Sequence, residues 1–198
     1  CLRAYKFGAS GRRLLTSDSL SGVGTPHGMG FSPDGKRLAV GATDQATIAL
    51  IDPVTLKLER ILSPPASNST RGFNAVAWSV DGKRLFAGGS WTDQQGHFAV
   101  CIWPDERNAV AECIPITGNT GLQATTGGRL LYVAADPGMG MLAPTGKPLF
   151  QIARVGLDFR NQRSRFQLST DASALMFGSM PSGPIDAAYD IRQMGWTK

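Results

Sequence analysis

Three aspartates are the residues whose type and spacing come nearest to a metal site. Asp44 and Asp136 stand at equivalent places in a repeat described below, and Asp93 lies near that place in another copy. Carboxylate oxygens gathered at one rim would suit Ca²⁺. Aspartate is also a favoured loop residue, because its side chain accepts hydrogen bonds from nearby backbone N–H groups. We therefore interpret the three as turn residues and keep a calcium site as the alternative.

Only two side chains are candidate general bases. His27 and His97 are the two histidines of the chain, and neither has a Ser or Cys beside it in a nucleophile arrangement. A Gly-x-Ser-x-Gly elbow is absent, and residues 30–37 lack the Ser or Thr of a phosphate-binding loop. The sequence therefore predicts no catalytic residue here, and any catalytic domain is expected outside this segment.

Other side chains are suited to binding a partner. Four arginines occur between residues 154 and 165, and guanidinium groups can hold a carboxylate or phosphate by two parallel hydrogen bonds. Trp91 lies in the loop 90–97, and tryptophan is enriched at binding hot spots. The plainer alternatives are a solvated basic loop and a tryptophan packed on its own sheet. The expected partner-binding residues are His27, Phe73, Asn74, Trp91, Arg160, Arg163 and Arg165.

Two of the three cysteines flank a short turn at residues 104–108. If Trp103 pairs with Ala111, Cys101 lies opposite Cys113, near enough for a disulfide. We favour the alternative, in which both are small thiols packed inside a sheet. With no Cys-x-x-Cys pair the cysteines indicate a reducing compartment, and we expect the cytoplasm. A periplasmic location stays open, because the chain starts at Cys1 rather than Met.

An internal repeat shows which elements must position these residues. Phe31-Ser-Pro-Asp-Gly-Lys-Arg-Leu-Ala-Val-Gly-Ala returns as Trp78-Ser-Val-Asp-Gly-Lys-Arg-Leu-Phe-Ala-Gly-Gly, and weaker copies follow at residues 127–135 and 171–178. Each unit reads as a short strand, an Asp-Gly turn, a strand of small residues, a loop, and two more strands. Four short strands in about 45 residues are typical of a propeller blade, which buries its faces only by stacking on its neighbours.

The repeats resemble those of WD-repeat β-propellers, and the likeness covers nearly the whole chain. The Ser-Pro-Asp-Gly-Lys turn at residues 32–36 is frequent in that family, whereas the Trp-Asp dipeptide is altered (Ile51-Asp52, Trp103-Pro104) and the Gly-His pair is missing. The stretch Ala75-Val-Ala-Trp-Ser-Val-Asp-Gly is closer to the looser propellers of bacterial multidomain proteins, either TolB-like or attached to a caspase-like peptidase domain.

This resemblance implies an all-β protein built from four-stranded antiparallel blades. We expect units at about residues 1–24 (partial), 25–64, 72–117, 118–156 and 164–198 (partial). Combining the two ends would give a four-bladed ring, but we favour an arc of about four blades from a larger propeller, such as a seven-bladed one. Residues 157–177, free of Gly and Pro, are expected to form a long polar connection followed by a strand.

The resemblance also implies a function. We expect a non-catalytic protein-interaction, sensor or scaffold module of a larger bacterial protein, one that would regulate an attached caspase-like peptidase. The alternative is a propeller enzyme, such as a metal-dependent hydrolase with its site at the central channel. The expected partner is a protein or peptide, for which the arginines favour acidic character, besides further blades of the same protein. Scattered basic residues (net charge +5) argue against nucleic acid, and no apolar run is long enough for a membrane.

Overall fold

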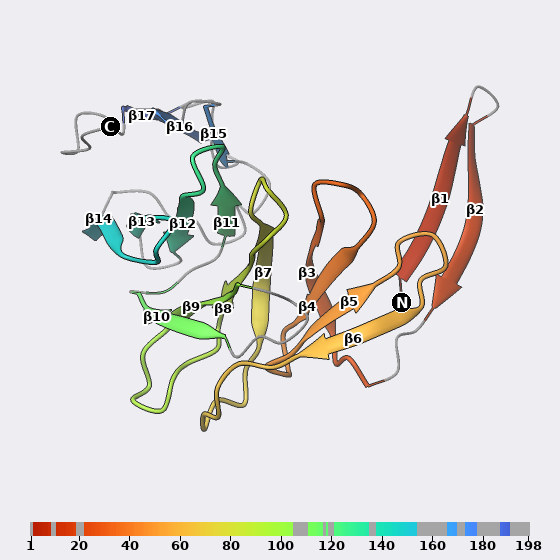
Figure 1. The fold of residues 1–198 in the computed structure, drawn as a ribbon, viewed down its shortest axis with the longest axis horizontal. Helices are drawn as coiled ribbons and strands as arrows, with labels where there is room; N and C mark the ends of the chain where they lie inside the picture. The colour runs from red at the N-terminus through yellow and green to blue at the C-terminus, as the bar shows by residue number, and fades with distance from the viewer. Residues whose placement is uncertain are drawn as a thin grey trace, which may run out of the picture.

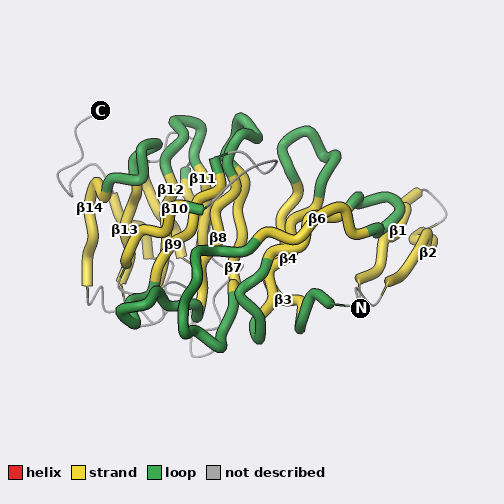
Figure 2. The backbone as a smooth tube through the Cα atoms, turned by 60° about the horizontal axis from the view of Figure 1, so that its bottom comes forward, coloured by secondary structure: helices red, strands yellow, loops and turns green. Residues whose placement is uncertain are grey.

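The described part of the chain contains strands, turns and loops but no helix (Figures 1 and 2). In this computed structural model, the described residues are 2–8, 11–18, 22–104, 111–116, 118, 121–134, 138–153, 166–169, 173–177 and 187–190. They include no helix that could cross a membrane.

Three antiparallel sheets of four strands form the centre of the molecule. Blade 1 consists of β3 (Pro26–Phe31), β4 (Leu38–Ala42), β5 (Ile48–Ile51) and β6 (Leu58–Leu62). Blade 2 consists of β7 (Phe73–Trp78), β8 (Leu85–Gly89), β9 (Ala99–Trp103) and β10 (Glu112–Pro115). Blade 3 consists of β11 (Gly121–Ala124), β12 (Leu130–Ala134), β13 (Gly138–Leu142) and β14 (Pro148–Ala153). In each blade the strands pair in chain order, which confirms the predicted four-stranded blade.

Smaller sheets lie on either side of the three blades. Strands β1 (Leu2–Gly8) and β2 (Gly11–Asp18) form a hairpin, and β15 (Phe166–Leu168), β16 (Ala174–Phe177) and β17 (Ala187–Asp190) form a three-stranded sheet. The expectation of a single strand within residues 157–177 is therefore wrong, because β15 and β16 both fall there. The Ser169 hydroxyl accepts hydrogen bonds from the Ser173 and Ala174 N–H groups and so closes their hairpin.

The Asp-Gly hairpins form as the sequence predicts. Gly35 and Gly82 both adopt a φ of 70°, a left-handed conformation that glycine reaches without steric cost. Each glycine N–H donates to the carbonyl of the serine that opens its turn, Ser32 (2.8 Å) or Ser79 (2.9 Å). The degraded third copy keeps this bond, from Gly128 N to the Thr125 carbonyl at 2.9 Å. The third copy therefore keeps the hydrogen bond that closes the turn, although it has lost the Asp-Gly motif.

Two of the three apolar clusters in the described part of the chain lie between blades, and the third lies on one face of blade 1. The second strands β4, β8 and β12 are buried along their whole length, while most of the outer strand β6 is exposed. One apolar cluster joins blades 1 and 2, and a second joins blades 2 and 3. The indole N–H of Trp78 in blade 2 donates to the Gly30 carbonyl of blade 1 at 3.0 Å. Neighbouring blades therefore depend on one another for burial.

Cys101 and Cys113 form a disulfide. Strands β9 and β10 pair with Cys101 directly opposite Cys113, the register that the sequence suggested. The expectation of two free thiols is wrong, because opposite residues of paired strands carry their side chains on the same face of the sheet. The bridge ties the outermost strand of blade 2 to its neighbour.

Candidate interaction surfaces

The up-and-down order of strands gives the blade stack two ends. Turns between the first and second strands, and between the third and fourth, lie at one end; we call residues 32–37, 52–57, 79–84, 125–129 and 143–147 the turn face. The loops joining blades, and those between second and third strands, lie at the opposite end. We call their described residues, 22–25, 43–47, 63–72, 90–98, 116 and 118, the loop face (Figure 2).

Two of the residues predicted to bind a partner on the loop face are in the core. Phe73 is 0% and Trp91 is 1% exposed. Their ring centroids lie 5.8 Å apart, and Phe73 also meets the Trp103 ring edge-on at 5.8 Å. This corrects the prediction for both side chains, and the alternative of an inward-packed Trp91 holds. Since burying an aromatic side chain is strongly favourable, the loop folds Trp91 inward instead of displaying it.

His27 and Asn74, by contrast, lie side by side at one cavity. Both line a cavity of about 290 Å³ between the first strands β3, β7 and β11. His27 is exposed, and the Asn74 amide donates to the Ser90 hydroxyl at 3.1 Å. The Asn74 Oδ1 atom is buried with no hydrogen-bond partner. The cavity thus holds polar groups contributed by neighbouring blades.

The two described aspartates of the suggested calcium site are engaged in loop hydrogen bonds, Asp44 with Thr25 of a neighbouring loop and Asp93 within its own loop. Asp44 accepts hydrogen bonds from the Thr25 backbone N–H and hydroxyl, both at 2.7 Å, and these bonds lower the pKa of its carboxyl. Asp93 accepts from the His97 backbone N–H at 2.8 Å, and one of its oxygens lies 3.3 Å from His97 Nδ1. Within the described ranges, no three His, Cys, Asp or Glu side chains come together as metal ligands.

The remaining predicted residues lie outside the described part of the chain. These are Asp136, Arg160, Arg163 and Arg165.

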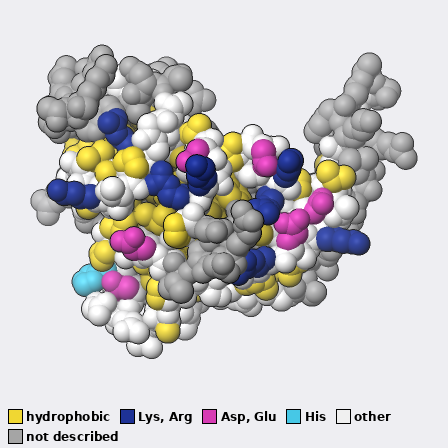
Figure 3. Space-filling view, viewed as in Figure 1, with side chains coloured by type: hydrophobic (Ala, Val, Ile, Leu, Met, Phe, Trp, Pro, Cys, Tyr) yellow, Lys and Arg dark blue, Asp and Glu magenta, His cyan; other side chains and the backbone are white. Residues whose placement is uncertain are grey.

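The turn face is rich in basic side chains. Among the described residues it carries Lys36, Arg37, Lys57, Lys83, Arg84, Arg129 and Lys147, against Asp34, Asp52 and Asp81. The described loop face carries Arg71 against Asp44 and Asp93. Figure 3, seen from the same direction as Figure 1, shows Lys and Arg spread across the described surface with Asp and Glu between them. Sequence reasoning missed this face, although the repeated Gly-Lys-Arg was its signal.

The aspartates of the turn face are bound to their own hairpins. The Ser32 hydroxyl donates to Asp34 Oδ1 at 2.6 Å and the Lys36 N–H donates to it at 3.1 Å. Asp81 repeats the arrangement with the Ser79 hydroxyl at 2.6 Å and the Lys83 N–H at 3.1 Å. In each turn the serine hydroxyl, followed by the backbone N–H, holds the pKa of the carboxyl below its usual value. Both side chains are therefore anionic at neutral pH.

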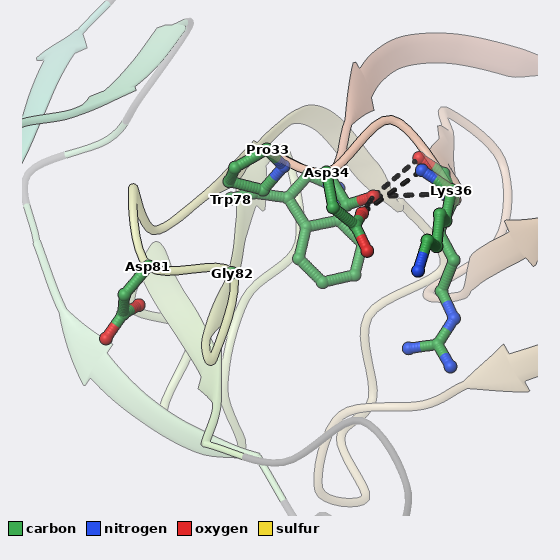
Figure 4. Close-up of a pocket in the computed structure, with 8 residues that line it drawn as sticks. Pro33, Asp34, Lys36, Trp78, Asp81 and Gly82 are labelled. Carbon is green, nitrogen blue, oxygen red and sulfur yellow. Dashed lines mark hydrogen bonds between the residues drawn. The ribbon is translucent and has the colours of Figure 1, made fainter.

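A crevice of about 420 Å³ separates the first hairpins of blades 1 and 2 (Figure 4). Lys36 and Arg37 line it from blade 1, and Asp81 and Gly82 line it from blade 2. Trp78 lies between the two hairpins, while the Asp81 side chain points away from Asp34 and Lys36. Asp34 also lines it from blade 1, so the crevice places Trp78 and Pro33 among side chains of both charges.

The equivalent crevice between blades 2 and 3 is crossed by an arginine. The Arg84 guanidinium donates to the Gly128 carbonyl at 3.3 Å and to the Pro144 carbonyl, both in blade 3. The counterpart of Arg84 in blade 1 is Arg37, which pairs with Glu59 on the outer strand of its own blade, with Nε and Oε2 3.5 Å apart. The two crevices are thus alike in position, but Arg84 bonds to the next blade whereas Arg37 pairs with a residue of its own blade.

Comparison with known proteins agrees on the fold and gives no family. No protein-family model matches the chain, and no curated protein matches it. Among solved structures it is similar to Kuenenia stuttgartiensis hydrazine synthase, with a TM-score of 0.64 and 15% identity over 90% of this chain and 50% of that one. It is also similar to the Myceliophteria thermophila Cps50 (Swd1) β-propeller domain, with a TM-score of 0.62 and 14% identity over 86% and 53%.

These observations define the class of fold. The chain is all-β and forms successive four-stranded antiparallel blades of a β-propeller. It spans about half the length of the structures that it resembles. The partial arc predicted from the sequence agrees with this coverage.

Proposed function

We propose that this chain is a non-catalytic interaction and scaffold module within a larger protein. The main support for the proposal is the packing of buried apolar side chains between neighbouring blades. Aromatic side chains such as Phe73 and Trp91 are buried between the blades. Polar turns and loops are therefore the segments exposed at both ends of the blade stack. Rigid scaffolds commonly present their binding residues on such segments.

The partner and cellular context form a finer part of this proposal. We propose a protein or peptide partner with acidic character, and a bacterial multidomain setting in which the module regulates a caspase-like peptidase. A test is to delete the module from the full-length protein and to measure turnover of a fluorogenic peptide. Altered turnover supports regulation, and unchanged turnover at all substrate concentrations contradicts it.

The disulfide bears on the compartment. Disulfides persist in oxidising compartments and are rare in the cytosol. The Cys101–Cys113 bridge therefore supports a location outside the reducing cytoplasm, in place of the cytoplasmic location expected from the sequence. Alkylation of the protein as it leaves its native compartment tests this, and two free thiols at these positions would contradict it.

An enzyme with its site near the first strands is the second candidate, favoured by the cavity that His27 and Asn74 share. To separate the two, the purified chain is assayed with ester and phosphoester substrates, with Ca²⁺ or with a chelator. The interaction module predicts no turnover above background. Metal-dependent turnover that falls in His27→Ala and Asn74→Ala, but not in Arg71→Ala on the loop face, would establish the enzyme instead.

A further inference from the structure

We propose that the turn face binds an acidic peptide segment bearing apolar side chains, seated in the crevice between the first hairpins of blades 1 and 2. This inference rests on the proposed interaction function and adds the surface and the chemistry of the partner.

The distribution of charge is the first argument. Lys36, Lys57, Lys83 and Lys147 are all exposed at the turn face, whereas Arg71 is the sole described Lys or Arg of the loop face. Each of the three described blades contributes at least one exposed lysine to the turn face, so positive charge runs from blade to blade. A surface of one predominant sign speeds the approach of an oppositely charged partner and selects against wrong ones.

The crevice supplies a seat within this charged face. Pro33 of the first hairpin lies against Gly82 of the second, so the two turns form the sides of one groove. Lys36 is exposed at its blade 1 side, and the Asp81 side chain points away from that side (Figure 4). Because Asp34 lines the same side, the groove suits an apolar side chain of the peptide beside Pro33 and Trp78, while the peptide carboxylates lie at the exposed Lys36 and Lys83 of the two hairpins.

Exposed apolar side chains identify a peptide as the occupant rather than a nucleic acid. Val54 is 68% and Val80 is 48% exposed in turns of this face, and Phe31, which is 62% exposed, directly precedes the first hairpin. A peptide can cover them with apolar side chains and place its carboxylates at the lysines. A nucleic acid carries a phosphate at every nucleotide and has no aliphatic side chain to cover Val54 and Val80, whereas a peptide can space its carboxylates to lie at the lysines and away from Asp34, Asp52 and Asp81.

Fluorescence anisotropy with a labelled probe tests the proposal. The probe is the peptide Glu-Glu-Leu-Glu-Phe-Glu-Leu-Glu-Glu, compared with a version carrying Ser for Leu and Phe and with a single-stranded oligonucleotide. We expect the acidic apolar probe to bind most tightly, with an affinity that falls as salt is raised. Absence of binding, or tighter binding of the oligonucleotide, overturns the proposal.

A charge reversal locates the binding surface. The double variant K36E/K83E is expected to bind the probe about tenfold more weakly, a loss of about 1.4 kcal/mol. Its matched control is R71E, an exposed reversal on the loop face, which should change the affinity less than twofold. Both variants are checked for an unchanged melting midpoint. Equal losses in the two variants, or no loss in K36E/K83E, contradict the turn-face site.

Photo-crosslinking gives a readout that does not depend on any variant. The probe carries a photoreactive phenylalanine at its Phe position, and crosslinks are expected at residues 32–37 and 79–84. Crosslinks confined to residues 90–98 would overturn the surface while leaving the interaction module intact. Substrate turnover by a chain that binds no peptide would instead remove the proposed function itself.

Discussion

Tyr132 and Gly140 lie opposite each other on β12 and β13 and show how tightly single residues fit within blade 3. Tyr132 is fully buried, and burial raises the pKa of its hydroxyl to about 12. A side chain on residue 140 would overlap the Tyr132 ring, so only glycine fits there. The sequence offers no sign of this contact, because Gly138-Met-Gly-Met-Leu reads simply as a strand of small and apolar residues.

Gly140→Ala should therefore destabilise the protein by overpacking. We expect a loss of about 1–3 kcal/mol in the free energy of unfolding, measured by urea denaturation. Gly127→Ala is the matched control, since an added methyl group there meets only the Thr125 hydroxyl, at 3.9 Å. Equal stability of the two variants would show that the space beside Tyr132 is larger than the structure indicates.

At the scale of the element, the Asp-Gly hairpin is the unit that the sequence specifies most completely. Ser79, Asp81 and Gly82 each contribute differently to the turn. The Ser79 hydroxyl accepts the Arg84 N–H at 2.9 Å, the Asp81 carboxylate accepts the Lys83 N–H, and Gly82 supplies the positive φ. All these bonds join residues within five positions of one another, so they form without help from the rest of the fold.

Gly82→Val tests this element. A β-branched residue is strained at a φ of 70°, and we expect a loss of about 1–3 kcal/mol in the free energy of unfolding. Lys83→Val is the control, because it places the same side chain one residue later, outside the left-handed region. A thermal unfolding midpoint in Gly82→Val equal to that of the control would argue against the hairpin geometry.

The disulfide acts on the second half of blade 2. It closes a loop with a sequence separation of 12 residues, and a closed loop of that order restricts the unfolded chain by about 3 kcal/mol. We expect the double variant Cys101→Ala/Cys113→Ala to lose about that much stability relative to the parent protein. Chemical denaturation of both proteins under non-reducing conditions measures the difference. Equal stability of the double variant and the parent protein would mean that the bridge does not constrain the unfolded chain.

At the scale of the whole molecule, several carboxylates with lowered pKa values make stability depend on pH. The Ser32 and Ser79 hydroxyls lower the pKa of Asp34 and Asp81, and backbone N–H groups of Thr25 and Thr55 lower that of Asp44 and Asp52. A carboxyl whose pKa is lower in the folded state stabilises it fully above the unfolded value, near about 4. That stability is lost as the pH falls through the folded value.

We therefore expect the melting temperature to be steady from pH 7 to pH 5 and to fall below about pH 4. Asp34→Asn should show a shallower fall than the parent protein, because one titrating group has been removed. Differential scanning calorimetry at pH 7, 5 and 3 checks both statements. A melting temperature that rises on acidification would contradict the role assigned to these turns.

Features that depend on residues close together along the chain can be predicted from the sequence alone. The repeat, the four strands of each blade, the Asp-Gly turns and the Cys101–Cys113 register follow from short-range spacing, and the structure has all of them. Alternation of side chains and turn geometry operate within a few residues, so they can be read along the chain. The repeat spacing likewise predicts that His27 and Asn74 both lie near the start of the first strand of their blade.

Which of these side chains remain available to a partner depends on how the blades pack against one another. Phe73 and Trp91 looked like binding residues, but the face of blade 1 packed against blade 2 buries both. The turn-face crevice exists only because Pro33 and Gly82, 49 positions apart, meet when the blades stack. Burial and clefts arise from contacts between residues distant in sequence, and the pattern along the chain does not encode which side chain fills the space between two blades.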